Sequence, residues 1–297
     1  MSILSALSGP SLSLDPVSDF QQLTAFPFMV NALEAGTAVA VTAGVVGWFM
    51  VLRRQSFAGH TLSMMAFPGA TGALLIGLPA AAGYFTFCGA SALVIGSSAG
   101  LGAGRHRGEE SAVTGAVQAF GLGCGFLFLS LYHGVLAGYE TLLFGDFLGI
   151  TRGQVLVLTV VAVLALIFLA LAGRPLLFAS VDEDVAAARG VPVRALSAGF
   201  MVMLAVAVSV AVQVVGVLLI FSLLVTPGAI VERLALRPGR AMAVSVALAL
   251  AFTWAGLSVA YFSPYPVSFF ITSFAFAAYL LARLPAAVAA AAAARQR

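Results

Sequence analysis

A histidine and a methionine at helical spacing are the residues of this chain whose types best fit metal chemistry. His60 and Met64 are four residues apart within residues 57–72, so on a helix both would lie on one face, with Ser63 beside them. An imidazole nitrogen and a thioether sulfur could together hold one soft or borderline metal ion. The spacing therefore predicts a metal-binding face on a single helix. The alternative is that His60 only forms a hydrogen bond between helices.

Glycine and proline residues surround this face. Gly59 comes before the pair, and Pro68 and Gly69 follow it. In a membrane-spanning helix, such residues allow close backbone approach or mark a break in the helix. Transporters commonly build binding sites at broken helices in the membrane. We therefore expect this run to be interrupted and to line a translocation path, and we place Pro227, in a later apolar run, in the same class.

A carboxylate in the first apolar run is a third candidate for the metal site. Glu34 lies about two helical turns from the outer end of that run. A charged group is expensive to bury in a membrane, so its presence there suggests a function. Glu34 could supply the negative charge that His60 and Met64 lack. The alternative is a side chain near the interface that reaches water.

Composition identifies a membrane protein. Of 297 residues, 62% are hydrophobic and 8% are charged, which excludes an ordinary soluble domain. All 14 basic residues are arginine, so the chain cannot contain the Gly-x-x-x-x-Gly-Lys loop that binds ATP. Any ATP hydrolysis would therefore require another subunit. Cys88 and Cys124 lie in apolar runs, where cysteine packs as a small hydrophobe, so we assign them no redox or metal role.

Apolar runs of membrane-crossing length follow one another from residue 28 onward. We expect an all-α, polytopic transmembrane helical bundle of about eight or nine spans. The expected spans are 28–52, 58–79, 81–103, 112–134, 154–173, 195–212, 214–231, 241–262 and 267–284. The sixth and seventh form one long run divided at Gln213 and Gly216, so two spans and a re-entrant pair both remain open.

Arginine placement predicts the orientation in the membrane. Arginines follow every second run, and only Arg152 falls on the opposite side, so the positive-inside rule places the N-terminus outside and the C-terminus in the cytoplasm. We expect residues 1–27 to form an extracytoplasmic lead-in with an interfacial helix. Residues 28–284 then form the transmembrane domain, and residues 285–297 form an alanine-rich cytosolic tail.

A short polar helix is expected between the fifth and sixth spans, over about residues 180–190. Ser180 and Glu183 have the spacing of a capping box, Arg189 lies in the last turn and Gly190 ends it. The first turn carries three acids: Asp182, Glu183 and Asp184. Such a helix on the cytosolic face suggests a coupling helix on which a soluble partner could push. The alternative is a well-capped loop without a partner.

Together these features resemble the membrane-spanning permease subunit of the zinc/manganese-type ABC transporters. The resemblance extends over nearly the whole chain from about residue 28, and its landmarks are residues 51–69, 143–148, 182–190, 215–229 and 256–261. It implies a permease homodimer, a cytosolic ATPase dimer bound at the coupling helix, and an extracytoplasmic solute-binding protein. It further implies import of a metal ion, zinc first and manganese next, with no permanently bound cofactor, ATP on the partner subunit and no nucleic acid.

The chain departs from that family at the predicted metal site. His60 stands where relatives usually have aspartate, and Met64 where they have histidine. An imidazole with a thioether is neutral and softer, so copper or a metal complex is an alternative substrate. A secondary transporter is a further alternative, but it would leave the coupling helix without a role. No motif of an intramembrane enzyme is present, so we expect a transport subunit rather than an enzyme.

Overall fold

Helices make up nearly all of the described chain. The computed structural model describes residues 21–99, 107–132, 145, 147 and 149–294, and these contain no strand. The helices are α2 (Pro27–Leu52), α3 (Ser56–Met64), α4 (Ala66–Leu75), α5 (Ala80–Ala99), α6 (Arg107–Leu131), α8 (Arg152–Val181), α9 (Glu183–Ala188), α10 (Val193–Val215), α11 (Val217–Arg233), α12 (Pro238–Tyr261) and α13 (Val267–Ala294). The all-α prediction is confirmed.

Seven helices in the described part of the chain are long and apolar enough to cross a membrane: α2, α5, α6, α8, α10, α12 and α13. The second expected span is divided into α3 and α4, of 9 and 10 residues, and the seventh is α11, of 17 residues. About 20 residues are needed to cross the hydrocarbon core, so the divided span and α11 are each marginal by length. Within the described residues, seven of the nine expected runs therefore contain a helix of spanning length and hydropathy.

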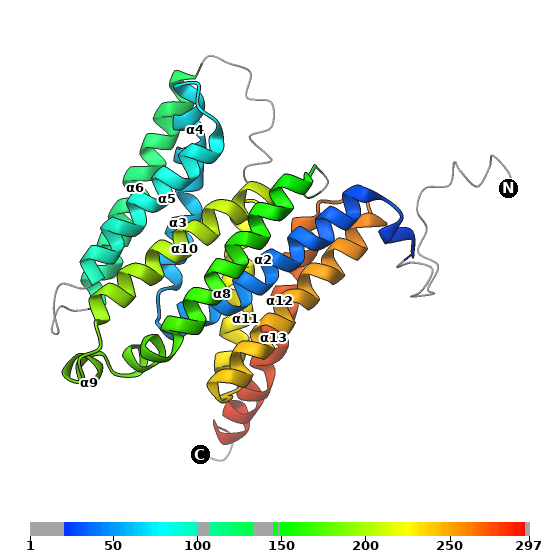
Figure 1. The fold of residues 1–297 in the computed structure, drawn as a ribbon. Coiled ribbons are helices and arrows are strands. Elements are labelled where there is room, and N and C mark those ends of the chain that lie inside the picture. The colour runs from blue at the N-terminus through cyan, green and yellow to red at the C-terminus, as the bar shows by residue number, and fades with distance from the viewer. Residues whose placement is uncertain (1–20, 100–106, 133–144, 146, 148, 295–297) are drawn as a thin grey trace, which may run out of the picture.

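Two groups of helices flank α3. On one side α4, α5 and α6 pack together, and on the other α2, α8, α11, α12 and α13 form a larger group (Figure 1). Helix α3 contacts α5 and α6 of the first group and α11 of the second, while α10 joins α5 to α8. The helix that carries His60 therefore lies at the boundary between the two groups.

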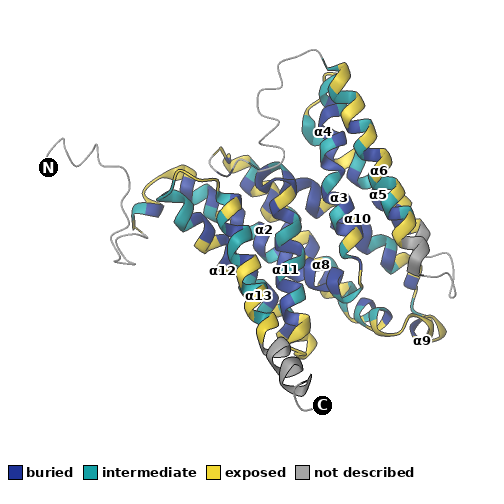
Figure 2. Ribbon diagram, turned by 180° about the vertical axis from the view of Figure 1, so that it is seen from behind, coloured by how far each residue is buried: buried dark blue, intermediate teal, exposed yellow. Residues whose placement is uncertain are grey.

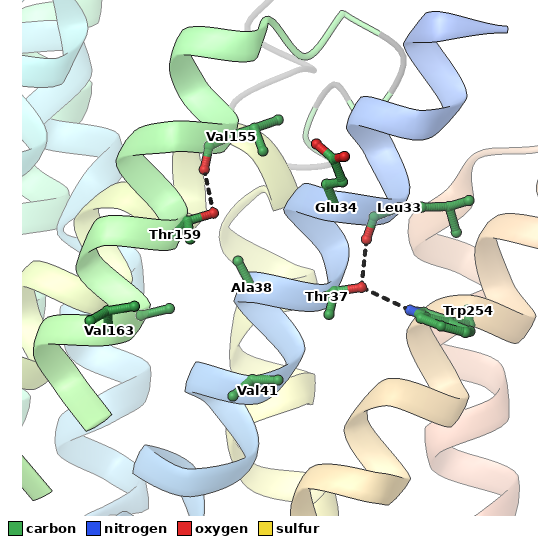
Figure 3. Close-up of a pocket in the computed structure, with 10 residues that line it drawn as sticks. Leu33, Glu34, Thr37, Ala38, Val41, Val155, Thr159, Val163 and Trp254 are labelled. Atoms are coloured by element: carbon green, nitrogen blue, oxygen red, sulfur yellow. Dashed lines mark hydrogen bonds between the residues drawn. The ribbon is translucent and has the colours of Figure 1, made fainter. Parts of the chain in front are cut away.

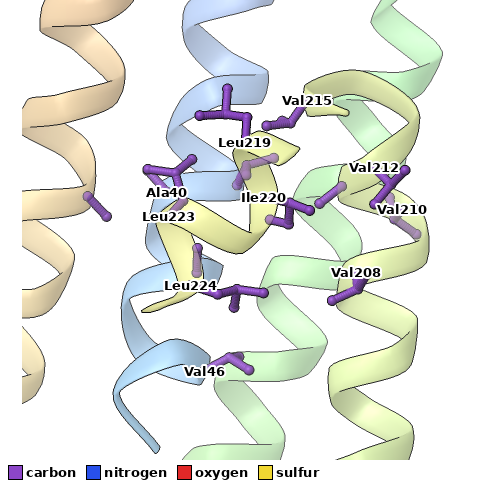
Figure 4. Packing of buried hydrophobic residues seen from close by; sticks show 14 of the residues in the cluster. Ala40, Val46, Val208, Val210, Val212, Val215, Leu219, Ile220, Leu223 and Leu224 are labelled. Atoms are coloured by element: carbon purple, nitrogen blue, oxygen red, sulfur yellow. The ribbon is translucent and has the colours of Figure 1, made fainter. Parts of the chain in front are cut away.

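The core is centred on α2, α10 and α11. Buried residues gather where these helices meet, and exposed residues cover the outer faces of α6, α12 and α13 (Figure 2). In the close view, Leu219 and Leu223 of α11 lie beside Ala40 of α2, and Ile220 lies on the side of Val208 of α10 (Figure 4). Exposed apolar faces on a chain of this composition are suited to lipid contact.

Small residues allow the central helices to approach closely. A Cβ atom on Gly47 of α2 would meet the backbone carbonyl of Leu224 on α11. The Ser245 hydroxyl of α12 donates a hydrogen bond of 2.8 Å to the Gly44 carbonyl of α2. Close backbone contact of this kind is the usual way in which helices associate in a membrane, where lipid removes the hydrophobic driving force.

Two helices extend beyond the expected spans. Helix α8 has 30 residues and continues through Arg174 and Pro175 to Val181, so it is about 45 Å long and exceeds the bilayer core. Helix α13 continues to Ala294, so the alanine-rich tail is helical over most of its length. The interfacial helix expected before residue 28 lies mostly outside the described residues, although residues 21–24 at its end are helical.

Candidate functional site

The second expected span is interrupted at Met65, one residue after the end of α3. Pro68 has no N–H, so it cannot donate the hydrogen bond that the Met64 carbonyl would accept in a continuous helix. The regular helical hydrogen bonds resume one residue later, where the Gly69 N–H donates to the Met65 carbonyl at 3.1 Å. The break therefore follows from one proline, and it lies next to Met64.

Two glycines in this stretch fit closely against neighbouring helices. Gly59 packs directly on the Met50 side chain of α2, where any Cβ would overlap the thioether. Gly69 of α4 and Gly83 of α5 meet backbone to backbone, because a Cβ on either would collide with the carbonyl of the other. The α3–α4 segment is thus fixed at one end to α2 and at the other to α5. Further along the chain, Pro227 lies inside α11 and is buried.

His60 lies half-buried on α3 and faces α11. Its ring centroid is 4.6 Å from that of Phe221, with an angle of 57° between the planes. Its Nδ1 atom is buried and has no hydrogen-bond partner; among the described residues the only other such side-chain atom is Oδ1 of Asn31. A buried polar atom without a partner is unfavourable, so it is a point where a ligand would be stabilised.

Met64 ends α3 one turn after His60 and is also half-buried. Its side chain packs against the core, so the two candidate ligands share a face as the spacing predicts. The hydroxyl of Ser63 is buried and donates to the Gly59 carbonyl at 3.0 Å. That bond turns Ser63 toward its own helix, which leaves His60 and Met64 as the side-chain donors of this face.

Another side of α3 is held by Thr61, which the sequence analysis did not name, and by Cys88, to which it gave only a packing role. The Thr61 hydroxyl donates to Oε1 of Gln118 on α6 at 2.9 Å. The Cys88 thiol of α5 donates to the Leu62 carbonyl at 3.2 Å. Polar residues in apolar runs were the available signal, because such groups need partners within the membrane. These bonds fix the rotation of α3 and so direct His60 toward α11.

Glu34 lies in a different part of the molecule. It is exposed beside a cavity of about 500 Å³ between α2, α8 and α12. Thr37 lies in the same cavity, where its oxygen accepts a bond of 3.0 Å from Nε1 of Trp254 and its hydroxyl donates to the Leu33 carbonyl (Figure 3). The other lining residues shown there are apolar apart from Thr159.

The structure does not bring Glu34 to the histidine and methionine. Met50, which contacts Gly59 next to His60, is 16 residues after Glu34 on the same helix, a separation of about 24 Å. Among the described residues, no group of three or more His, Cys, Asp or Glu side chains could hold a metal ion. Within the described part of the chain, the candidate side-chain donors on this face are therefore His60 and Met64.

The predicted coupling helix is α9, but its cap differs from the expected one. The prediction that Ser180 caps this helix is wrong, since α8 continues to Val181 and the Ser180 hydroxyl donates to the Leu176 carbonyl at 2.6 Å. Asp182 is the N-cap instead, and its carboxylate accepts a bond of 2.9 Å from the Val185 N–H.

The other end of α9 closes as a Schellman motif. Gly190 has a φ of 81°, its N–H donates to the Ala187 carbonyl, and the Val191 N–H donates to the Ala186 carbonyl. The candidate contact residues for a partner are all exposed: Asp182, Glu183, Asp184 and Arg189. Only Ala186 is buried, in a small apolar cluster with Ala179 of α8 and Val193 of α10.

Comparison with known proteins identifies the family of this chain. One family model covers residues 25–285. This chain belongs to the ABC 3 transport family. Its relatives there include the manganese transport system membrane protein MntC of Halalkalibacterium halodurans, 28% identical over 71% of this chain and 70% of that protein. Another is the chelated iron transport system membrane protein YfeC of Yersinia pestis, 29% identical over 75% of this chain and 74% of that protein.

A solved structure has the same architecture. PsaBC from Streptococcus pneumoniae, in complex with Fab, superimposes with a TM-score of 0.77 at 25% identity, over 90% of this chain and 95% of that chain. The resemblance to a metal-type ABC permease is confirmed, and this ABC 3 family member is a multi-pass membrane protein.

Proposed function

We propose that this chain is the permease subunit of an ABC importer that carries a transition-metal ion, with zinc as the first candidate. The observation that carries the proposal is the unpartnered, buried Nδ1 of His60, next to Met64 at the break between α3 and α4. In an ABC 3 permease, a helix break with a free metal donor is suited to a translocation path. Relatives that are named for manganese and chelated iron support a metal as cargo.

The donor types favour the softer end of the metal series. Imidazole suits zinc, copper, iron and nickel, whereas manganese prefers carboxylate, carbonyl and water oxygen. Zinc therefore fits His60 better than manganese does. A second candidate is copper(I) or a metal complex, because Met64 supplies a thioether and the described residues contain no group of three or more His, Cys, Asp or Glu side chains that could hold a metal ion.

The remaining parts of the proposal concern the assembly. Two copies of the permease would enclose the path, and a solute-binding protein would deliver the metal from outside. Two cytosolic ATPases would press on the exposed acidic face of α9, on the side where the arginines concentrate. ATP binding would then move α9 and open the path alternately to the two sides. Membership of the ABC 3 transport family and the similarity to PsaBC support a permease that works with partner subunits.

The test is metal uptake into vesicles that hold the complete transporter. Wild type is compared with His60→Ala, Met64→Ala and the double variant, using zinc, manganese and copper(I) in turn. Because one of two side-chain donors is lost, we expect uptake of the preferred metal to fall about tenfold or more in each single variant. Met242→Ala is the matched control, since Met242 is a half-buried methionine on α12 outside this face.

The outcomes separate the candidates. Selective loss of zinc uptake supports the first, and loss of copper(I) uptake supports the second. Full uptake of every metal by an intact His60→Ala/Met64→Ala complex would contradict this site and would assign selectivity to the binding protein.

A further inference from the structure

Arg53 lies where the first transmembrane helix ends and the metal-bearing segment begins. It is the C-cap residue of α2, directly before the turn that leads into α3. Its side chain is half-buried, and its guanidinium lies 5.6 Å from the ring centroid of Phe200 on α10. Phe200 is fully buried, so this cation rests on a rigid part of the core.

The three guanidinium nitrogens are directed at three different elements. Nη2 donates to the Ser197 hydroxyl of α10 at 2.6 Å, and Nη1 donates to the Ser180 hydroxyl of α8 at 3.4 Å. Nε donates to Oε1 of Gln55, the N-cap residue of α3, at 3.0 Å. A planar fork with donors in fixed directions can hold all three, whereas the single ammonium of lysine cannot reproduce this geometry.

The two serines belong to the unit that carries α9. Ser180 is in the last turn of α8, just before α9, and Ser197 is in the second turn of α10, just after it. Ala186 of α9 is buried between Ala179 of α8 and Val193 of α10. The end of α8, all of α9 and the start of α10 are therefore packed as one unit, to which Arg53 is bonded on both sides.

The third contact leads to the metal face. Gln55 is buried, and its backbone carbonyl accepts the first helical bond of α3 from the Gly59 N–H at 3.0 Å. His60 is the next residue. A displacement of the α8–α9–α10 unit would therefore reach the His60 helix through Arg53 and Gln55, beside the direct packing of α10 on α3.

We infer that Arg53 is a positioning residue that couples the motion of α9 to α3, and so links ATP use on the cytosolic side to the metal face. This inference rests on the proposed function for the identity of the cargo and for α9 as the contact with the ATPase. It does not require Arg53 to touch metal or ATPase. Loss of the guanidinium leaves both ends of the link in place but removes the bonds between them.

The test measures coupling in the reconstituted complex of permease, ATPase and binding protein. ATP hydrolysis and zinc uptake are measured in the same vesicles, and their ratio is compared for wild type, Arg53→Ala and Arg53→Lys. We expect Arg53→Ala to raise the ATP hydrolysed per ion taken up by about tenfold, with a smaller rise for Arg53→Lys. Arg54→Asn is the matched control: Arg54 is exposed and has a φ of 59°, which asparagine tolerates, and its ratio should stay at the wild-type value.

A milder pair of variants guards against a folding defect in Arg53→Ala. Ser197→Ala removes only the shortest bond of the link, so it should raise the ratio less than Arg53→Ala does. Because both changes interrupt one link, the Arg53→Ala/Ser197→Ala double variant should be no worse than Arg53→Ala alone. Full additivity of the two effects, or a wild-type ratio in Arg53→Ala, overturns the inference.

A distance measurement separates this inference from the proposed function. Spin labels are placed at Ala187 on α9 and Phe57 on α3, both exposed, in a Cys124→Ser background. If Arg53 makes α9 and α3 move together, addition of ATP should leave the distance between the two labels unchanged in wild type. In Arg53→Ala the two helices should move separately, so ATP should change that distance. An identical response to ATP in the two proteins overturns the inference. No metal is needed, so a wild-type complex that transports none of the tested metals would contradict only the proposed function.

Discussion

At the scale of single residues, the surroundings of His60 decide what it can bind. The imidazole lies against Phe221, while Thr61 and Leu62 on the other side of α3 are bonded to α6 and α5. An ion held at Nδ1 would therefore lie at the boundary between the two helix groups. Helix spacing predicted that His60 and Met64 share a face. It could not show that Gly59 packs at the far end of α2 from Glu34, because that contact joins separate spans.

The position of Glu34 leads to a prediction at this scale. We expect Glu34→Gln to keep metal uptake within about twofold of wild type, the range of a substitution outside a key contact. The reason is the separation of about 24 Å along α2 from the helix position beside Gly59. Uptake in the vesicle assay is measured beside His60→Ala. A loss in Glu34→Gln as large as that of His60→Ala would show that the carboxylate belongs to the metal site after all.

At the scale of elements, α9 shows both what a sequence predicts and where it stops. Its acids, its glycine terminator and its place between two spans are all local signals, and they located the helix correctly. The sequence placed the cap at Ser180, two residues before the actual N-cap, Asp182. Local spacing could not exclude Ser180, because its place in α8 and its hydrogen bond from Arg53 depend on tertiary structure.

The exposed acids of α9 give the prediction for this scale. Glu183→Ala with Asp184→Ala should leave the cap at Asp182 and the buried Ala186 intact, so the helix should persist. If these acids contact the ATPase, hydrolysis stimulated by the loaded binding protein should fall about tenfold, while metal binding to the permease is unchanged.

The control for α9 is Glu232→Ala, because Glu232 is an exposed acid at the end of α11. Its stimulated hydrolysis should match wild type. Fully stimulated hydrolysis in the α9 double variant would show that the ATPase docks elsewhere.

At the scale of the whole molecule, the chain is organised around α2. This helix contacts α8, α11 and α12, and its glycines allow α11 and α12 to approach its backbone. Hydropathy predicted the spans because apolar length is a property of each segment alone. The interruption of the second span was predicted from its glycine and proline residues, and α3 and α4 confirm it. The position of these two short helices between two helix groups could not be predicted, since it depends on contacts between distant segments.

Close packing around α2 can be tested by adding one carbon atom. Gly47→Ala places a Cβ against the Leu224 carbonyl, so we expect it to lower the free energy of unfolding by about 1–3 kcal/mol. Thermal unfolding of the purified protein in detergent measures the effect. Gly89→Ala is the control, because a Cβ there meets nothing within 4 Å and should leave the melting temperature unchanged. Equal melting curves for the two variants would mean that α2 and α11 separate without cost.

Gly216 joins α10 to α11 through a single residue with a φ of 80°, with no loop between the two helices. Because no loop separates the two helices, a displacement of α10 at its α9 end is transmitted to α11 without a flexible segment between them. The chain turns back at Gly216, and Phe221 lies about one and a half turns further along α11. The displacement of α10 would therefore be passed on to Phe221. Phe221, whose ring lies against His60, is therefore connected to α9 through α10 and Gly216, while Arg53 connects the same helices to the start of α3. One displacement of α9 would thus reach the two faces of α3 by separate routes.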